Sequence, residues 1–177
     1  MAFAALFRRK SRPSAAHALY GEIVNASRAP AFFAAWGVPD TLDGRFEMIA
    51  LHAFLALRRL KSAPGASAFS QELFDLMFAD LDRNLRELGA SDLGVGRQVK
   101  VMAQSFYGRI RAYERGLAGE ENLEEALKRN MFGTANPAPA QLANAAAYLR
   151  RQDAALARAP ATALLRGELP LDAGEGA

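Results

Sequence analysis

The side chains best suited to metal or acid–base chemistry are two histidines and a cluster of carboxylates. His17 and His52 are the only histidines, no cysteine is present, and neither histidine lies in an HExxH or Glu-x-x-His motif. Zinc and di-iron centres therefore lack their usual ligands. Asp75, Asp80 and Asp82 could bind magnesium, but their spacing is not DDxxD and no second acidic cluster faces them. We interpret them as helix charges that pair with nearby cations, such as the arginine four residues after Asp82.

A second candidate motif is the sequence GVGR, which covers Gly94 to Arg97. Two glycines at an expected helix start could bind an anion through backbone N–H groups. A plain loop with a helix cap explains the same residues and is the favoured interpretation. Walker A and GxGxxG patterns are missing. The sequence thus predicts a protein that is not an enzyme and carries no cofactor.

Polar residues also recur at helical spacing in two longer stripes. The first stripe consists of Arg45, His52 and Arg59, and the second of Lys100, Tyr107, Arg111 and Glu114. Residues at these spacings share one side of a helix. If the stripes meet across a groove, they would pair with acids such as Asp75 and Asp82, because buried charges without partners are costly. Such a network would fix helix register or frame a binding groove, while a solvated face explains the arginines as well.

Two further interpretations concern packing. Apolar neighbours flank His52, which is typical of a hydrogen-bonded packing histidine rather than a catalyst. A row of small residues comprises Val101, Ser105, Gly108 and Ala112. We expect a neighbouring helix to approach this row closely, so that Gly108→Leu would destabilise the fold by overpacking.

Turn residues divide the chain into successive amphipathic helices, and no segment shows sustained strand alternation. Prolines and hydroxyl side chains mark the starts, and glycines mark several ends. The expected helices cover residues 14–27, 30–36, 41–61, 67–88, 96–117, 120–133 and 140–157, with a short one near 164–165. These patterns predict an all-α, single-domain bundle of about six to eight helices. The helical domain would span residues 14–168, after a flexible leader (1–13) and before a disordered tail (169–177).

Size and charge narrow the class of protein. With 177 residues and 19.1 kDa, the chain is long enough for one hydrophobic core. A net charge of +3 is too modest to predict specific nucleic-acid binding. No apolar run reaches the roughly 20 residues that a membrane span needs. Absence of cysteine, and a start unlike a secretory signal, favour a cytoplasmic location.

The first residues allow one further hypothesis about membranes. Apolar side chains come first in the leader and basic ones follow directly after them, namely Phe3, Phe7, Arg8, Arg9 and Lys10. Such a segment could contact anionic lipid at the inner face of the cytoplasmic membrane. A solvated leader is the favoured alternative, because one or two helical turns bind weakly.

Three extended segments resemble the ubiquinol–cytochrome c chaperone family. They read GVPDTLDGRFEMIALHAFLALRRL, FSQELFDLMFADLDRNLRELGASDLGVGRQVKVM and FYGRIRAYERGL. The resemblance extends from about Leu19 to Leu127. It includes Asp40, Thr41, Gly44, Arg45, Phe46, His52, Leu60, Gln71, Phe74, Asp75, Asp82, Leu85, Arg86, Glu87, Gly89, Asp92, Val95, Lys100, Met102, Tyr107, Gly108, Arg109 and Tyr113.

The resemblance implies a short bacterial assembly factor for respiratory complex III that binds newly made cytochrome b. Mitochondrial relatives act with a small partner protein near the ribosomal exit. Whether this chain uses a small partner protein or a ribosome stays open. Binding an apolar client helix requires an exposed apolar surface with a polar rim. The candidate surface comprises Phe32, Phe33, Trp36, Arg45, His52, Asp75, Asp82, Lys100, Tyr107 and Arg111. The alternative is a lipid or quinone-type binder or enzyme, with an apolar pocket reached by Arg45, His52 or the aspartates.

Overall fold

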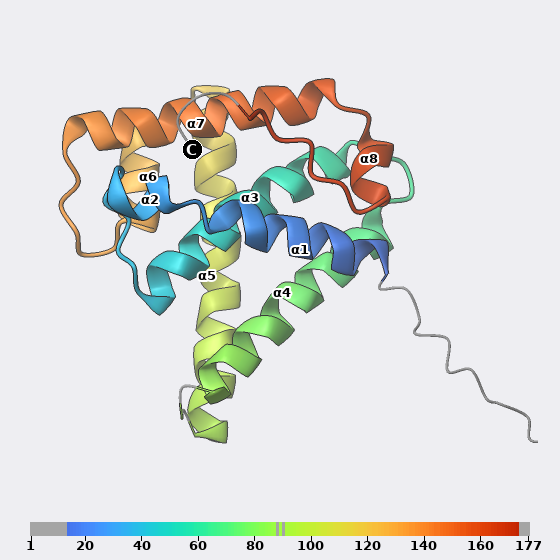
Figure 1. The fold of residues 1–177 in the computed structure, drawn as a ribbon, viewed down its shortest axis with the longest axis horizontal. Helices are drawn as coiled ribbons and strands as arrows, with labels where there is room; N and C mark the ends of the chain where they lie inside the picture. Colours follow the sequence, from blue (N-terminus) through green and yellow to red (C-terminus); the bar gives the residue numbers. More distant parts are fainter. Residues whose placement is uncertain (1–13, 88, 90, 174–177) are drawn as a thin grey trace, which may run out of the picture.

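The computed structural model describes residues 14–87, 89 and 91–173, and these residues form α-helices and no strand (Figure 1). The helices are α1 (Ala15–Ser27), α2 (Pro30–Ala34), α3 (Leu42–Lys61), α4 (Ser67–Glu87), α5 (Asp92–Ala118), α6 (Leu123–Met131), α7 (Pro139–Arg158) and α8 (Ala161–Leu165). The predicted all-α fold is confirmed. The leader residues singled out for membrane contact, Phe3, Phe7, Arg8, Arg9 and Lys10, lie outside the described residues.

Side-chain caps set the starts of the first and third helices. The Ser14 hydroxyl accepts a hydrogen bond from the His17 backbone N–H at 3.2 Å, and Thr41 accepts one from Gly44 N–H at 3.2 Å. Each cap satisfies one of the backbone amides that a helix start leaves without an internal partner. Both helices therefore begin where the sequence predicts.

Helix α5 begins four residues earlier than predicted. Ser91 accepts from the Gly94 N–H at 3.3 Å, and the helix starts at Asp92 instead of near Gly96. Glycines weaken a helix in isolation by roughly 1 kcal/mol each. Here the cap and the complete burial of Val95 in the first turns outweigh that cost.

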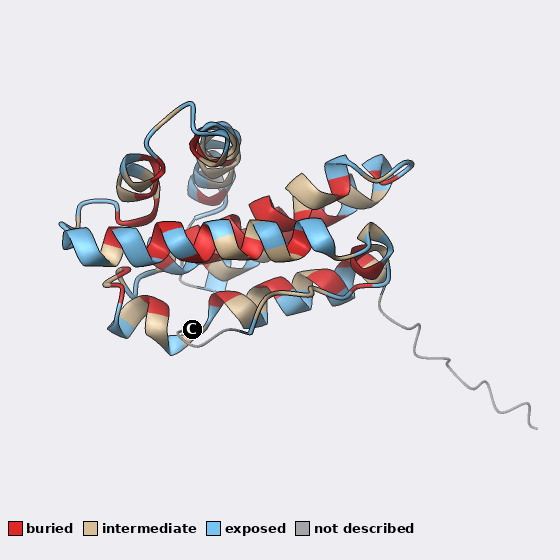
Figure 2. Cartoon of the chain, turned by 90° about the horizontal axis from the view of Figure 1, so that it is seen from above, coloured by how far each residue is buried: buried red, intermediate tan, exposed pale blue. Residues whose placement is uncertain are grey.

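Helix α3 occupies the centre of the arrangement. Helix α1 packs against α3 and α4, α7 packs against α3 and α6, and α8 contacts α1 and α3. Helices α4 and α5 contact each other where the end of α4 meets the start of α5, at one extremity of the molecule, and they diverge from there (Figure 1). In Figure 2 the buried residues concentrate along the inward sides of the helices. Helix α3 is buried on every side over residues 50–56. The largest buried side chains include Tyr113, Phe32, Phe54, Phe106 and Phe132.

The small-residue row does not form the predicted close contact. Gly108 is exposed, and a Cβ added there would meet no atom within 4 Å. Val101 is 53% exposed. Close packing on α5 occurs instead at Gly116, where an added Cβ would lie 2.6 Å from Leu123 Cδ1. The prediction of overpacking at Gly108 was therefore wrong, because this part of the row faces solvent.

The packed chain continues beyond the boundary predicted at residue 168. Leu169 and Leu171 pack against the core. The Gln152 side chain donates to the Asp172 carbonyl at 3.0 Å and accepts from the Asp172 N–H at 2.7 Å. Residues 169–173 thus belong with the helical domain, in contrast to the disordered tail expected there.

Candidate functional site

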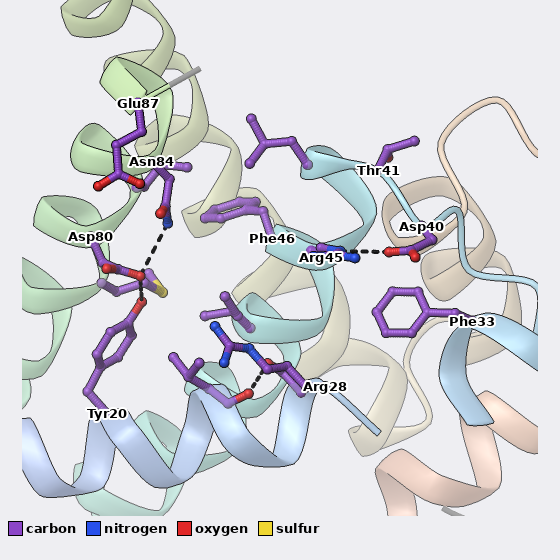
Figure 3. Close-up of a pocket in the computed structure, with 16 residues that line it drawn as sticks. Tyr20, Arg28, Phe33, Asp40, Thr41, Arg45, Phe46, Asp80, Asn84 and Glu87 are labelled. Atoms are coloured by element: carbon purple, nitrogen blue, oxygen red, sulfur yellow. Dashed lines mark hydrogen bonds and ion pairs between the residues drawn. The ribbon is translucent and has the colours of Figure 1, made fainter. Parts of the chain in front are cut away.

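A cavity lies between α1, the first half of α3 and the second half of α4 (Figure 3). Its volume is about 670 Å³ and it opens to solvent. We call it the α1–α3–α4 groove. It is lined by Tyr20, Val24, Ser27, Arg28, Phe33, Asp40, Thr41, Leu42, Arg45, Phe46, Ile49, Met77, Asp80, Leu81, Asn84 and Glu87.

Apolar side chains from two helices form the floor of the groove. Leu42, Phe46 and Ile49 follow one another at four- and three-residue spacing on α3, so they share one side of that helix. Met77 and Leu81 lie one turn apart on α4. Phe46, Met77 and Leu81 are buried, whereas Leu42 and Ile49 are half-buried. The floor therefore offers apolar area that a bound apolar side chain would cover.

A hydrogen-bonded cluster around Asp80 forms one rim. The Tyr20 hydroxyl donates to Asp80 Oδ2 at 2.9 Å, and Asn84 Nδ2 donates to the same oxygen at 3.4 Å. Burial raises the pKa of Tyr20 above its ordinary value, and the Asp80 carboxylate raises it further. Tyr20 thus stays protonated at neutral pH, and its hydroxyl ties α1 to α4 across the groove.

The opposite rim carries an exposed ion pair. Arg45 Nε donates to Asp40 Oδ1 at 2.6 Å, and this hydrogen bond holds the pKa of the Asp40 carboxyl below its usual value. Arg28 and Glu87 also line the groove. Within the described residues, neither of them makes an ion pair. The groove thus combines an apolar floor with a rim of both charge signs, an arrangement that suits binding.

The chain matches one known protein family over most of its length. A profile of the family described as Ubiquinol-cytochrome C chaperone matches residues 34–171. The chain belongs to this family. The resemblance predicted from the three extended segments is therefore confirmed.

Two similar proteins support the assignment to this family, and the chain matches only part of each. The chain is similar to the mouse protein named ubiquinol-cytochrome c reductase complex assembly factor 1, with 26% identity over 140 residues, 78% of this chain and 48% of the mouse protein. The Xenopus laevis protein of that name is 26% identical over 123 residues, 68% of this chain and 62% of its own length. This chain thus aligns with less than two thirds of each of these proteins.

A solved structure extends the comparison to three dimensions. The crystal structure of the Cbp3 homolog from Brucella abortus superposes with a TM-score of 0.79 and is 37% identical. The match covers 89% of this chain and 88% of that chain. The fold of that structure therefore accounts for nearly the whole chain.

Part of the predicted client surface lies in the interior of this chaperone fold. Phe32 and Trp36 are 0% and 4% exposed, with ring centroids 4.7 Å apart. Trp36 also packs edge-on against Tyr148 of α7 at 5.2 Å. These two aromatic residues therefore join α2 to α7 and do not form a surface. Phe33, next to them in sequence, is half-buried and lines the groove.

His52 lies in the same aromatic cluster and is completely buried. Its Nδ1–H donates to the Met48 carbonyl at 2.7 Å, and its Nε2 accepts from the Tyr148 hydroxyl at 2.8 Å. This tautomer follows because a carbonyl oxygen can only accept. Burial lowers the pKa of His52 to about 4, so the ring is neutral at pH 7. His52 is thus a packing histidine inside the core, as its apolar neighbours in the sequence indicated.

The two predicted polar stripes do not pair with Asp75 and Asp82 across a groove, although one member of each, Arg59 and Glu114, lines a shared cavity of about 370 Å³. Arg45 pairs with Asp40 on its own side of the groove, while Asp75 accepts from Gln71 at 2.7 Å. Asp82 pairs with Arg86 at 2.6 Å, which confirms the predicted helix charge pair. Lys100, Tyr107 and Arg111 are exposed on α5. Among the predicted surface residues, Phe33 and Arg45 are those that line the groove.

Sequence reasoning missed the most buried ion pair of the described chain. Arg109 donates through Nε to Glu47 Oε2 at 2.5 Å and through a second guanidinium nitrogen to Oε1. The Glu47 side chain is 8% exposed and the Arg109 side chain 15%. Burial raises the pKa of Glu47, although Arg109 opposes the shift. The pair is 62 residues apart in sequence, so no local pattern indicated it.

No group of three or more His, Asp or Glu side chains within the described residues is placed to hold a metal ion.

Proposed function

We propose that this protein is a chaperone that binds newly made cytochrome b and promotes its incorporation into ubiquinol–cytochrome c reductase. Membership of the chaperone family is the observation that carries the proposal. The names of the mouse and Xenopus relatives, both assembly factors of that reductase complex, agree with it. A binding function without a chemical step fits the absence of recognisable catalytic motifs in the sequence.

The α1–α3–α4 groove is the proposed client site. Cytochrome b is a membrane protein whose apolar helices would present rows of side chains at three- and four-residue spacing. Ligand sites typically measure about 300–1,000 Å³, so a groove of about 670 Å³ would hold a few client side chains and not a whole helix. Met77 and Phe33 suit such contacts because methionine and aromatic side chains adapt to varied partners.

The charged rim would limit how tightly the client is held. Arg28 and Glu87 could pair with polar groups that flank an apolar client segment, and the Arg45–Asp40 pair is exposed and easily rearranged. Rim charges contribute mainly to orientation and association rate, whereas apolar contacts in the floor contribute most of the affinity. A client bound this way can be released to the assembling complex.

A matched pair of leucines on α3 tests the site. Leu42 and Leu57 are both half-buried, but Leu42 lines the groove and Leu57 lines a separate cavity of about 470 Å³. In cells whose only copy carries Leu42→Gln, we expect less assembled complex III and faster loss of cytochrome b. Leu57→Gln, with a similar effect on stability, should leave assembly normal. Normal assembly with both variants, verified to be folded, would exclude the groove as the client site.

The same groove could instead hold a lipid or quinone-type molecule, because its floor is apolar and Arg45 and Asp80 reach it. Extraction and mass spectrometry of the purified protein distinguish the two occupants. A stoichiometric lipid that is absent from the Leu42→Gln variant would favour the small molecule over the client helix. The proposal predicts that no such lipid is found. Binding to a small partner protein or to the ribosome stays a separate prediction.

A further inference from the structure

The side of α5 that points away from the other helices carries an exposed basic and aromatic surface. We call it the outer face of α5, and it consists of Arg97, Lys100, Val101, Gln104, Tyr107, Gly108 and Arg111. Successive members are one or three residues apart, which keeps them on one side of the helix. Figure 2 shows α5 nearly end-on at one margin of the molecule, with exposed residues on its outer side. A surface at the margin is accessible to a large, flat partner.

Positive charge is concentrated on this face. No acidic residue occurs on α5 between Leu93 and Tyr113. Arg109, in the same stretch, is neutralised by Glu47, whereas Arg97, Lys100 and Arg111 make no ion pair with any described residue. Over residues 14–173 as a whole, acidic and basic residues are equal in number. The outer face is therefore positive because charges are segregated, and not because the domain is basic throughout.

Two of the largest exposed apolar side chains lie among these cations. Tyr107 is 61% exposed and Val101 is 53% exposed. The Tyr107 ring packs on Phe74, with centroids 5.6 Å apart, and Phe74 in turn contacts Phe78 at 4.6 Å. The aromatic neighbours thus support the ring from beneath and present its outer side to solvent. Tyrosine favours boundaries where one side is apolar and the other is wet.

We propose that the outer face of α5 binds the surface of a membrane that contains anionic lipid. Lys and Arg attract anionic headgroups while Tyr and Val enter the boundary between headgroups and acyl chains. None of the described helices combines enough length and apolar character to cross a bilayer, so the contact would be peripheral. The proposal does not depend on which client occupies the groove.

The shape of the face favours a membrane over an acidic peptide. Peptides bind in grooves, but Val101 and Tyr107 line none of the three cavities described. Nucleic acid would also meet the cations, but it would leave the exposed Val101 without an apolar partner. A lipid surface accommodates both the charges and the apolar side chains at once.

Vesicle binding by the full chain tests the charge contribution. Each cation near an anionic bilayer strengthens binding about fivefold. With phosphatidylglycerol-containing vesicles, R97Q/K100Q/R111Q should therefore bind about a hundredfold more weakly than the wild type. The control R129Q/R150Q/R158Q removes the same charge from exposed arginines elsewhere, and it should retain most of the binding. Equal losses in the two triple variants would show that only net charge, or the basic leader, matters and would overturn the proposal.

A fluorescent dye tests whether position 107 contacts the membrane surface. Because the chain contains no cysteine, a single introduced cysteine can carry the dye. An environment-sensitive dye on Tyr107→Cys should shift to the blue with anionic vesicles and not with phosphatidylcholine vesicles. The dye on Arg150→Cys, on the exposed side of α7, should not respond. No shift at position 107, or a response to an RNA oligonucleotide but not to vesicles, would refute a lipid-binding role. Because these measurements use vesicles without client, their failure is separate from failure of the proposed chaperone function.

Discussion

Acidification should destabilise the fold through one buried side chain, His52. The ring is 0% exposed, and in the neutral state its Nδ1–H donates to the Met48 carbonyl while its Nε2 accepts from the Tyr148 hydroxyl. Protonation would place a second N–H against the Tyr148 hydroxyl and a positive charge among the rings of Phe32 and Tyr148. The folded state therefore resists protonation, whereas the unfolded chain accepts a proton readily.

The size of the effect follows from the two pKa values. Burial lowers the pKa of His52 from 6.5 to about 4 in the folded state. Because the folded pKa is the lower one, stability from the neutral ring is fully present above pH 6.5 and declines as the pH falls toward 4. Between pH 7 and pH 4 the loss amounts to about 3 kcal/mol. That is a large part of the 5–15 kcal/mol typical of a domain.

Urea unfolding at pH 7 and pH 4 measures this loss. We expect the wild type to lose about 3 kcal/mol more than His52→Gln, which has no ring to protonate. The raised pKa of Glu47 acts with the opposite sign, but it is common to both proteins and cancels. His17→Gln, at the other histidine, which is exposed, should keep the wild-type pH dependence. If wild type and His52→Gln show the same pH dependence, the buried neutral ring does not govern acid stability.

Two further substitutions test the packing of α5 by urea unfolding. Gly108→Ala should raise the free energy of unfolding by up to about 1 kcal/mol, since an added Cβ meets open space in a helix interior. Gly116→Ala should lower the free energy of unfolding by about 1–3 kcal/mol, since its Cβ would lie 2.6 Å from Leu123 Cδ1. Equal effects of the two changes would contradict the way in which α5 packs. Glu47→Gln should lower the free energy of unfolding by about 3 kcal/mol by leaving the Arg109 guanidinium buried without its carboxylate. A loss below about 0.5 kcal/mol, as for exposed pairs, would show that the pair is solvated.

The sequence predicted the positions of the helices better than the contacts between them. Local signals were sufficient for the starts of α1 and α3, because Ser14 and Thr41 cap them through bonds spanning three residues. The start of α5 was missed because Gly94 and Gly96 are poor helix formers, and only tertiary burial of Val95 reveals why the helix extends there. Gly108 was misjudged for a related reason, since spacing alone does not show whether a helix face is covered.

The candidate site depended on contacts that no local pattern contains. Tyr20 and Asp80 are 60 residues apart, and the groove exists only because α1 packs beside α4. Phe32 and Trp36 looked like an exposed aromatic surface because the sequence does not indicate that Tyr148 of α7 covers them. Phe32 and Trp36 are therefore buried, whereas Phe33 lines the groove.

Photo-crosslinking in living cells tests the central proposal most directly. A photoreactive phenylalanine derivative at Phe33 would face the α1–α3–α4 groove, and the same group at Ala147 on the exposed side of α7 serves as the control. The proposal predicts a covalent adduct with cytochrome b from position 33, formed during synthesis of cytochrome b, and none from position 147. A chain that supports assembly of complex III but yields no cytochrome b adduct at position 33 would contradict it.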